Sequence, residues 1–118
     1  MNPKTKKKPT SAMRRINRYY RYSLAILGHS PDAHLYELAG ASFYDSIFQP
    51  PERSRAREFL NRLHELDEGL DYLESKIFHY DCLEMGRHYH YWYLTYANKN
   101  SYRRKKRRLE AKLSEAFR

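Results

Sequence analysis

The fold is decided by a stretch near the C-terminus that reads Asn98-Lys99-Asn100-Ser101-Tyr102-Arg103-Arg104-Lys105-Lys106-Arg107-Arg108-Leu109-Glu110. Ser101 is a good helix N-cap, because its hydroxyl can accept a hydrogen bond from a backbone N–H that has no partner inside the helix. Asn98 and Asn100 favour a tight turn just before it. Apolar side chains then recur at roughly helical spacing, at Tyr102, Leu109, Leu113, Ala116 and Phe117. We therefore expect a turn followed by a basic helix, although a run of cations alone is equally typical of a solvated face or a disordered tail.

The composition of the whole chain favours helices over strands. Valine is absent and other β-branched residues are few, so little in the sequence favours strand formation. The length of 118 residues fits one domain. We expect an all-α bundle of about four or five helices with a C-terminal helix-turn-helix-like unit. Residues 1–10 are expected to form a disordered basic arm, residues 11–118 a single helical domain, and residues 88–117 its DNA-binding unit.

Capping residues mark the helices that precede the basic segment. The pattern predicts a first helix over residues 11–27, with Gly28 as its C-terminal stop. Ser30 followed by Pro31 is typical of a helix start, and this second helix is expected to run to about Ile47. Pro51 then opens a third helix.

A leucine-rich stripe gives the clearest periodicity. Its members are spaced alternately three and four residues apart, at Leu63, Leu66, Leu70, Leu73, Ile77 and Tyr80. Gly69 lies off the stripe and is expected only to weaken the helix locally. The favoured interpretation is that the stripe packs on other helices of the same chain. The alternative is a homodimer or an adaptor seam through residues 56–80.

The charge is divided into two basic ends and an acidic middle. Residues 1–21 hold eight basic side chains and residues 99–108 hold seven, and neither segment contains an acid. Residues 22–98 contain twelve acidic and six basic side chains. Two separate positive segments predict a polyanionic partner, most simply nucleic acid.

Cysteine and histidine do not form a recognisable catalytic or metal motif. Cys82 is the only cysteine, which excludes an intrachain disulfide and favours a reducing, cytoplasmic setting. His79 is three residues from Cys82, but nothing in the sequence supplies an oxyanion hole for a nucleophile and base. His88 and His90 would diverge on a helix and share a face only on a strand. We expect no enzyme activity, metal or cofactor, and no membrane span.

A tyrosine-rich segment, residues 89–96, precedes the basic helix. It is expected to form a short helix followed by the turn at Asn98, and a β-hairpin is the alternative because aromatic residues also favour strands. Rings in this segment either fill the core or stack on bases of single-stranded RNA or DNA.

The basic helix has two distinguishable faces. Its apolar stripe should face the core, so Arg103, Arg104, Arg107 and Arg108 should point outward toward a DNA groove. Lys105 and Lys106 lie nearer the stripe and are expected to reach flanking phosphates. The predicted DNA-binding residues are Asn100, Ser101, Tyr102, Arg103, Arg104, Lys105, Lys106, Arg107 and Arg108.

The segment from Ser101 to Leu113 resembles the last helix of phage and prophage late-gene regulators of the RinA and ArpU type, which are similar to sigma factor region 4. The resemblance implies a sequence-specific duplex DNA-binding transcriptional regulator, with RNA polymerase as a further partner. The chain departs from that pattern in three places. The first helix of the family's unit has a Glu-Ile-Ala-like core, where this chain has Tyr91-Trp92-Tyr93-Leu94. The glycine often found in the family's turn is replaced by Asn98-Lys99-Asn100, and the second tyrosine of its recognition helix is replaced by Arg103. A single kinked helix is the alternative geometry for this unit.

Overall fold

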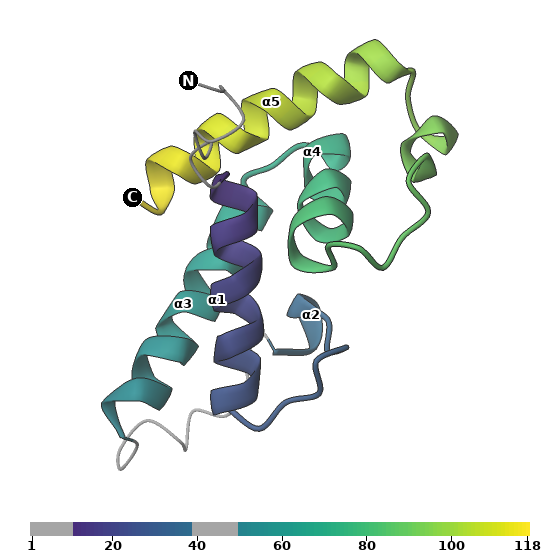
Figure 1. The fold of residues 1–118 in the computed structure, drawn as a ribbon. Helices are drawn as coiled ribbons and strands as arrows, with labels where there is room; N and C mark the ends of the chain where they lie inside the picture. The colour runs from purple at the N-terminus through teal and green to yellow at the C-terminus, as the bar shows by residue number, and fades with distance from the viewer. Residues whose placement is uncertain (1–10, 39–49) are drawn as a thin grey trace, which may run out of the picture.

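The computed structural model describes residues 11–38 and 50–118, and within them every regular element is a helix (Figure 1). The elements are α1 (Ala12–Ile26), α2 (Leu35–Leu38), α3 (Pro51–Glu68), α4 (Tyr72–Ile77), the π-helix η3 (Phe78–Leu83), the 3₁₀ helix η4 (Trp92–Thr95) and α5 (Lys99–Ala116). Helices α1 and α3 lie side by side, and α5 crosses one end of this pair with α4 beneath it. The prediction of an all-α fold is confirmed.

The first helix begins and ends where its capping residues predict. The Ser11 side chain accepts a hydrogen bond from the backbone N–H of Arg14, 3.2 Å away. Helix α1 ends at Ile26, and Gly28 follows with a φ of 74°, a backbone conformation that a side chain would disfavour.

The second helix starts later than predicted. Ser30 does not cap it, because residues 30–33 form a turn instead: the N–H of Ala33 donates to the Ser30 carbonyl at 3.0 Å. The N–H of Asp32 donates to the Ser30 hydroxyl at 3.2 Å. Proline after serine suits the second position of such a turn as well as the first position of a helix. Helix α2 covers only Leu35–Leu38, and the remainder of the prediction, to Ile47, lies outside the described residues.

The third helix is interrupted where a continuous one was expected. Helix α3 ends at Glu68, and Asp71 opens α4 with a capping box. The Asp71 carboxylate accepts from the N–H of Glu74 at 2.8 Å, and the Glu74 carboxylate accepts from the N–H of Asp71 at 3.3 Å. Gly69 therefore sits at a helix end, because a helix-weakening glycine directly precedes a strong new N-cap.

The leucine stripe packs within the chain despite this break. Leu63 and Ile77 are completely buried, while Leu66, Leu70 and Leu73 are partly buried against the same core. The seam that the alternative interpretation placed over residues 56–80 is therefore divided between two helices of different direction (Figure 1).

The last turns of the α4 segment widen into η3. The N–H of Glu84 bonds to the carbonyl of His79, five residues back, at 2.8 Å. The Asn17 side chain on α1 donates to the carbonyls of Cys82 at 2.9 Å and Leu83 at 3.3 Å. These contacts from a second helix stabilise the widened turn and fix η3 against α1.

Buried polar groups join α3 to the α4–η3 segment. His79 Nε2 lies 3.0 Å from Asp67, and the Ser75 hydroxyl donates to the other oxygen of that carboxylate at 2.7 Å. Cys82 instead donates to the Met13 carbonyl, and burial raises the pKa of its thiol. The Asp67 carboxylate lies between His79 and Ser75, so the order of a nucleophile–base–acid triad is not present here.

None of the described helices combines the length and the apolar character that crossing a membrane requires.

Candidate nucleic-acid interface

The basic helix α5 begins three residues earlier than the sequence suggested. Asn98 is its N-cap: the side-chain oxygen accepts from the N–H of Ser101 at 2.8 Å. Ser101 is therefore inside the first turn, and Asn100 is exposed on it. Both residue types are good caps, and the one nearer the aromatic segment is used. Tyr102 is buried with its ring stacked on Tyr93.

The segment before α5 is a single 3₁₀ turn, η4, rather than an α-helix. Trp92 and Tyr93 are buried, and the Tyr93 ring stacks on that of Tyr102 with centroids 3.8 Å apart and planes 5° apart. The predicted short helix is present, but the unit differs from a pair of α-helices joined by a turn. Residues 50–118 contain no strand, so the alternative of a β-hairpin is not found. The cap at Asn98 separates η4 from α5, so the alternative of a single kinked helix is not found either.

The inner face of α5 carries lysines that are paired with acids from the acidic middle of the chain. Lys105 forms an ion pair with Asp71. Lys112 Nζ lies 2.9 Å from the carboxylate of Glu74, whose side chain is only 3% exposed. Lys105 is thus engaged by Asp71 within the fold, and its predicted contact with a phosphate stays a prediction.

Asp81 on η3 collects three donors and holds the start of α5. It accepts hydrogen bonds from the Trp92 indole at 2.9 Å and from the Tyr102 hydroxyl, and Lys106 Nζ lies 3.3 Å away. Burial and the hydrogen bond to Asp81 raise the pKa of Tyr102. Tyr102 is 9% exposed, as expected for a member of the apolar stripe, while Lys106 lies beside it and remains partly exposed. The predicted DNA contacts of both residues stay predictions.

The outer face of α5 carries arginines whose surroundings differ from those of the paired lysines on the inner face. Arg103, Arg104, Arg107 and Arg108 are all exposed, as their positions on the helix predicted. In the part of the chain that the structure describes, none of these four forms an ion pair. Their charge is therefore not neutralised inside the molecule.

A tertiary contact brings the start of α1, which belongs to the N-terminal basic segment, to the same end of the molecule as α5. The Glu110 carboxylate on α5 accepts hydrogen bonds from the first backbone N–H groups of α1, those of Ala12 and, at 3.3 Å, Met13. A carboxylate at a helix N-terminus is favoured by the helix dipole. The contact places the start of α1, with Arg14, beside α5.

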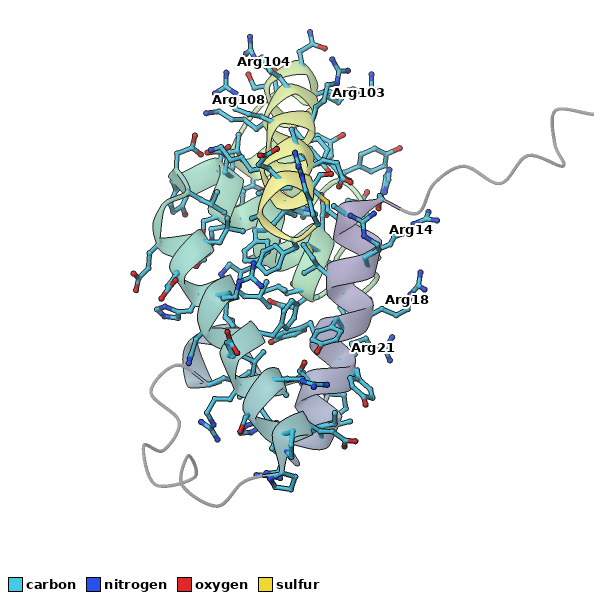
Figure 2. The ribbon with its side chains drawn as sticks, turned by 90° about the vertical axis from the view of Figure 1, so that its left-hand side faces the viewer. Arg14, Arg18, Arg21, Arg103, Arg104 and Arg108 are labelled. Carbon is cyan, nitrogen blue, oxygen red and sulfur yellow. The ribbon has the colours of Figure 1, made fainter. Side chains whose placement is uncertain are left out.

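The exposed arginines of the two helices together make up the basic surface, which extends across α5: Figure 2 shows Arg103 on the side of α5 that carries the α1 arginines, and Arg104 and Arg108 on its other side. It consists of Arg14, Arg18 and Arg21 on α1 and Arg103, Arg104, Arg107 and Arg108 on α5. The α1 arginines are exposed and point outward along one edge. The sequence identified two basic segments but did not indicate that the start of α1 lies beside α5. The residue that makes this contact, Glu110, is the first acid after the run of cations, and it was the only local signal of the contact.

The paired histidines do not share a site. His88 Nε2 lies 3.0 Å from Glu84, and its ring stacks on Tyr80 with centroids 4.0 Å apart. His90 is exposed and contacts Tyr91 instead. Among residues 11–38 and 50–118, no group of three or more potential ligands is arranged to hold a metal ion.

Comparison with known proteins gave no match to a family model, a curated protein or a solved structure. The resemblance of the C-terminal segment to late-gene regulators therefore stays a prediction.

Proposed function

We propose that this protein binds duplex DNA through the basic surface, with α5 lying in the major groove. The observation that carries the proposal is the sorting of charge on α5. Each lysine that faces inward is paired with a carboxylate, whereas the four outward arginines have no acidic partner in the described structure. Solvent-facing arginines without intramolecular partners supply the charge that phosphates and guanine edges require.

The placement of α5 suits a helix that enters a groove. It crosses one end of the molecule, so its outer face is not covered by another described helix (Figure 1). A major groove roughly 12 Å wide admits one α-helix, and arginine can bond both guanine acceptors there. Arg14 at the start of α1 lies beside α5, where it would meet the phosphates that flank the groove, and Arg18 and Arg21 follow along α1 away from α5.

Sequence-specific binding of this kind would serve transcriptional control. That role is supported by the residues from Ser101 to Leu113, which resemble the recognition helix of phage-type regulators. The single-turn η4 in place of an α-helix means that α5 is held by aromatic stacking and by Asp81, not by a standard helix-turn-helix partner.

A matched pair of double variants tests the proposal. Selection from random DNA first supplies the preferred duplex, and fluorescence anisotropy then measures its affinity. Arg104→Ala/Arg108→Ala should weaken binding about a hundredfold, because two base or phosphate contacts are lost. The control Arg55→Ala/Arg118→Ala removes the same charge from exposed positions outside the basic surface and should change affinity only slightly.

The salt dependence provides a second measurement on the same duplex. If about six phosphates are neutralised, the affinity of the parent protein should fall about a thousandfold between roughly 50 and 200 mM salt. The Arg104→Ala/Arg108→Ala variant should show a shallower slope, by about two in the log–log plot. Equal losses in the two double variants, or no selected sequence, would show that α5 does not read DNA.

A further inference from the structure

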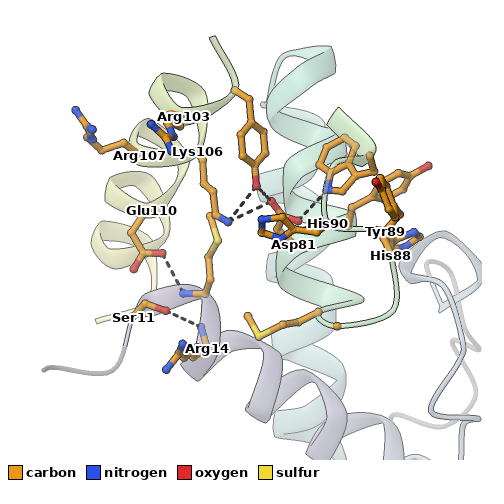
Figure 3. A pocket seen from close by; sticks show the side chains of 16 residues that line it. Ser11, Arg14, Asp81, His88, Tyr89, His90, Arg103, Lys106, Arg107 and Glu110 are labelled. Atoms are coloured by element: carbon orange, nitrogen blue, oxygen red, sulfur yellow. Dashed lines mark hydrogen bonds and ion pairs between the residues drawn. The ribbon is translucent and has the colours of Figure 1, made fainter. Parts of the chain in front are cut away.

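A hollow of about 650 Å³ adjoins the basic surface and shares Arg14, Arg103 and Arg107 with it. It is bounded by the start of α1, the part of α5 from Tyr102 to Glu110 and the segment from Met85 to Trp92 (Figure 3). Its volume falls within the range of roughly 300 to 1,000 Å³ that is typical of small-ligand sites.

One wall of the hollow is cationic. Arg103 and Arg107 line it from α5, and Arg14 lines it from α1. All three are exposed, and none forms an ion pair within the described residues. Lys106 also lines the wall but is held by Asp81 at 3.3 Å. Three arginines from two helices thus border the hollow and supply positive charge at its margin.

The two acids in the hollow are already used by the fold. Asp81 is bonded by the Trp92 indole, the Tyr102 hydroxyl and Lys106. Glu110 accepts from the first N–H groups of α1. Both carboxylates are thus engaged by donors of the protein: Asp81 is paired with the Lys106 ammonium group, and Glu110 is held by backbone N–H groups at the positive end of the α1 helix dipole.

The opposite wall is aromatic and open. Tyr89 is 74% exposed, and its nearest ring neighbour is Tyr91, with centroids 5.7 Å apart and planes inclined by 61°. His90 is exposed beside it. In contrast, the Tyr102 ring that also lines the hollow is stacked on Tyr93. Tyr89 and His90 therefore retain ring faces on which a flat aromatic ligand can stack.

Resting on the proposed function, we propose that this hollow binds one unpaired nucleotide of a DNA strand. Its base stacks on Tyr89 and His90, and its phosphate lies against Arg14, Arg103 and Arg107. A base inside a duplex has both faces covered by its neighbours, so only a base at a single-stranded end or a flipped position can enter. The protein would then hold a duplex by α5 and favour one that carries an unpaired base beside it.

The test compares two probes that share the selected duplex. One is blunt, and the other carries a short single-stranded overhang whose bases include the fluorescent analogue 2-aminopurine. The overhang should raise the affinity of the parent protein about tenfold, which is within the range for base stacking on an aromatic ring. The fluorescence of the 2-aminopurine should fall on binding, because stacking quenches it.

The variant Tyr89→Ala/His90→Ala should lose both effects while it binds the blunt duplex like the parent. The matched control is Tyr22→Ala, which removes a ring that is 54% exposed on α1 and does not line the hollow. It should keep both effects. An unchanged thermal melting temperature of each variant establishes that the fold is retained.

Three outcomes would overturn the inference. The first is equal affinity of the parent for the blunt and overhanging probes. The second is an overhang preference that survives Tyr89→Ala/His90→Ala. The third is Tyr89-dependent binding of free thymidine monophosphate without an overhang preference, which would identify a mononucleotide site. In each case the proposed function is judged by a separate result. It is retained if binding of the blunt duplex depends on Arg104 and Arg108, and it is rejected if that binding does not depend on them.

Discussion

The two faces of α5 carry the same charge in different surroundings. On the inner face, Lys105, Lys106 and Lys112 reach Asp71, Asp81 and Glu74 on the α4–η3 segment. On the outer face, the four arginines between residues 103 and 108 extend into solvent, and no described acid pairs with them. One run of cations therefore divides into a part that holds the fold together and a part that is available to a partner.

The chemistry of the two side chains fits this division. The lysine ammonium is a compact charge on a flexible stem, which suits single contacts with a carboxylate such as that of Asp71 or Glu74. The planar guanidinium of arginine presents a fork of donors that matches phosphates and guanine edges. The net-acidic middle of the chain consequently has a structural use, because three of its carboxylates receive the inner lysines.

The largest effect on stability is expected from removing an inner-face cation. Lys112→Met leaves the buried Glu74 carboxylate without the ammonium group that now lies 2.9 Å away. The free energy of unfolding should fall by about 2 kcal/mol, because a buried charged acceptor loses its partner. Urea unfolding followed by circular dichroism measures this change.

The outer-face substitution Arg108→Met is the control for that experiment. It places the same new side chain on the same helix at an exposed position without an ion pair in the described structure. The free energy of unfolding should change by no more than about 0.5 kcal/mol. Equal destabilisation by Lys112→Met and Arg108→Met would contradict the functional division between the faces.

A smaller effect is expected when the buried partner is neutralised as well. Glu74→Gln in the Lys112→Met background removes the uncompensated charge but retains an oxygen that can accept from the N–H of Asp71. The double variant should recover about 1 kcal/mol relative to Lys112→Met alone, as a double-mutant cycle would measure. No recovery would mean that Lys112 contributes through its aliphatic chain rather than through its charge.

The smallest effect is expected for the pH dependence of stability that comes from Asp71, which forms the partly exposed ion pair with Lys105. Partial burial of Asp71 would raise its pKa, but hydrogen bonds from Lys105 and from the backbone N–H of Glu74 lower it below the ordinary value. Because the folded-state pKa is the lower one, the stabilising contribution of Asp71 is present above its ordinary pKa and disappears as the pH falls through the lowered value.

Comparison of Asp71→Asn with the parent measures that contribution. Asparagine keeps the N-cap but has no charge to titrate. Between about pH 6 and about pH 3, the parent should lose more stability than Asp71→Asn, by less than about 1 kcal/mol because the ion pair is partly exposed. If the two proteins lose stability in parallel, Asp71 does not contribute to the acid sensitivity.

Prediction from sequence succeeded where the signal was confined to one helix. The limits of α1 followed from Ser11 and Gly28, and the outward direction of Arg104 and Arg108 followed from the 3.6-residue period. It failed where two local signals competed. Asn98 and Ser101 were both good caps, and the Gly69–Asp71 segment could be read as a weak point within a helix or as a helix end.

The sequence by itself determined that this chain is helical, where α1 lies, and which residues of the basic run face away from the core, because capping and periodicity act within a few residues. Only the tertiary structure decided the partners of the lysines and the closeness of the two basic ends. The Lys112–Glu74 pair spans 38 residues, and the Glu110 contact with Ala12 spans 98. Contacts over such separations depend on how the helices pack, and no local pattern specifies them. Packing consequently divides the six consecutive cations into lysines that pair with acids of the fold and arginines that face solvent. Packing also forms the hollow beside Tyr89 from three segments that are distant in sequence.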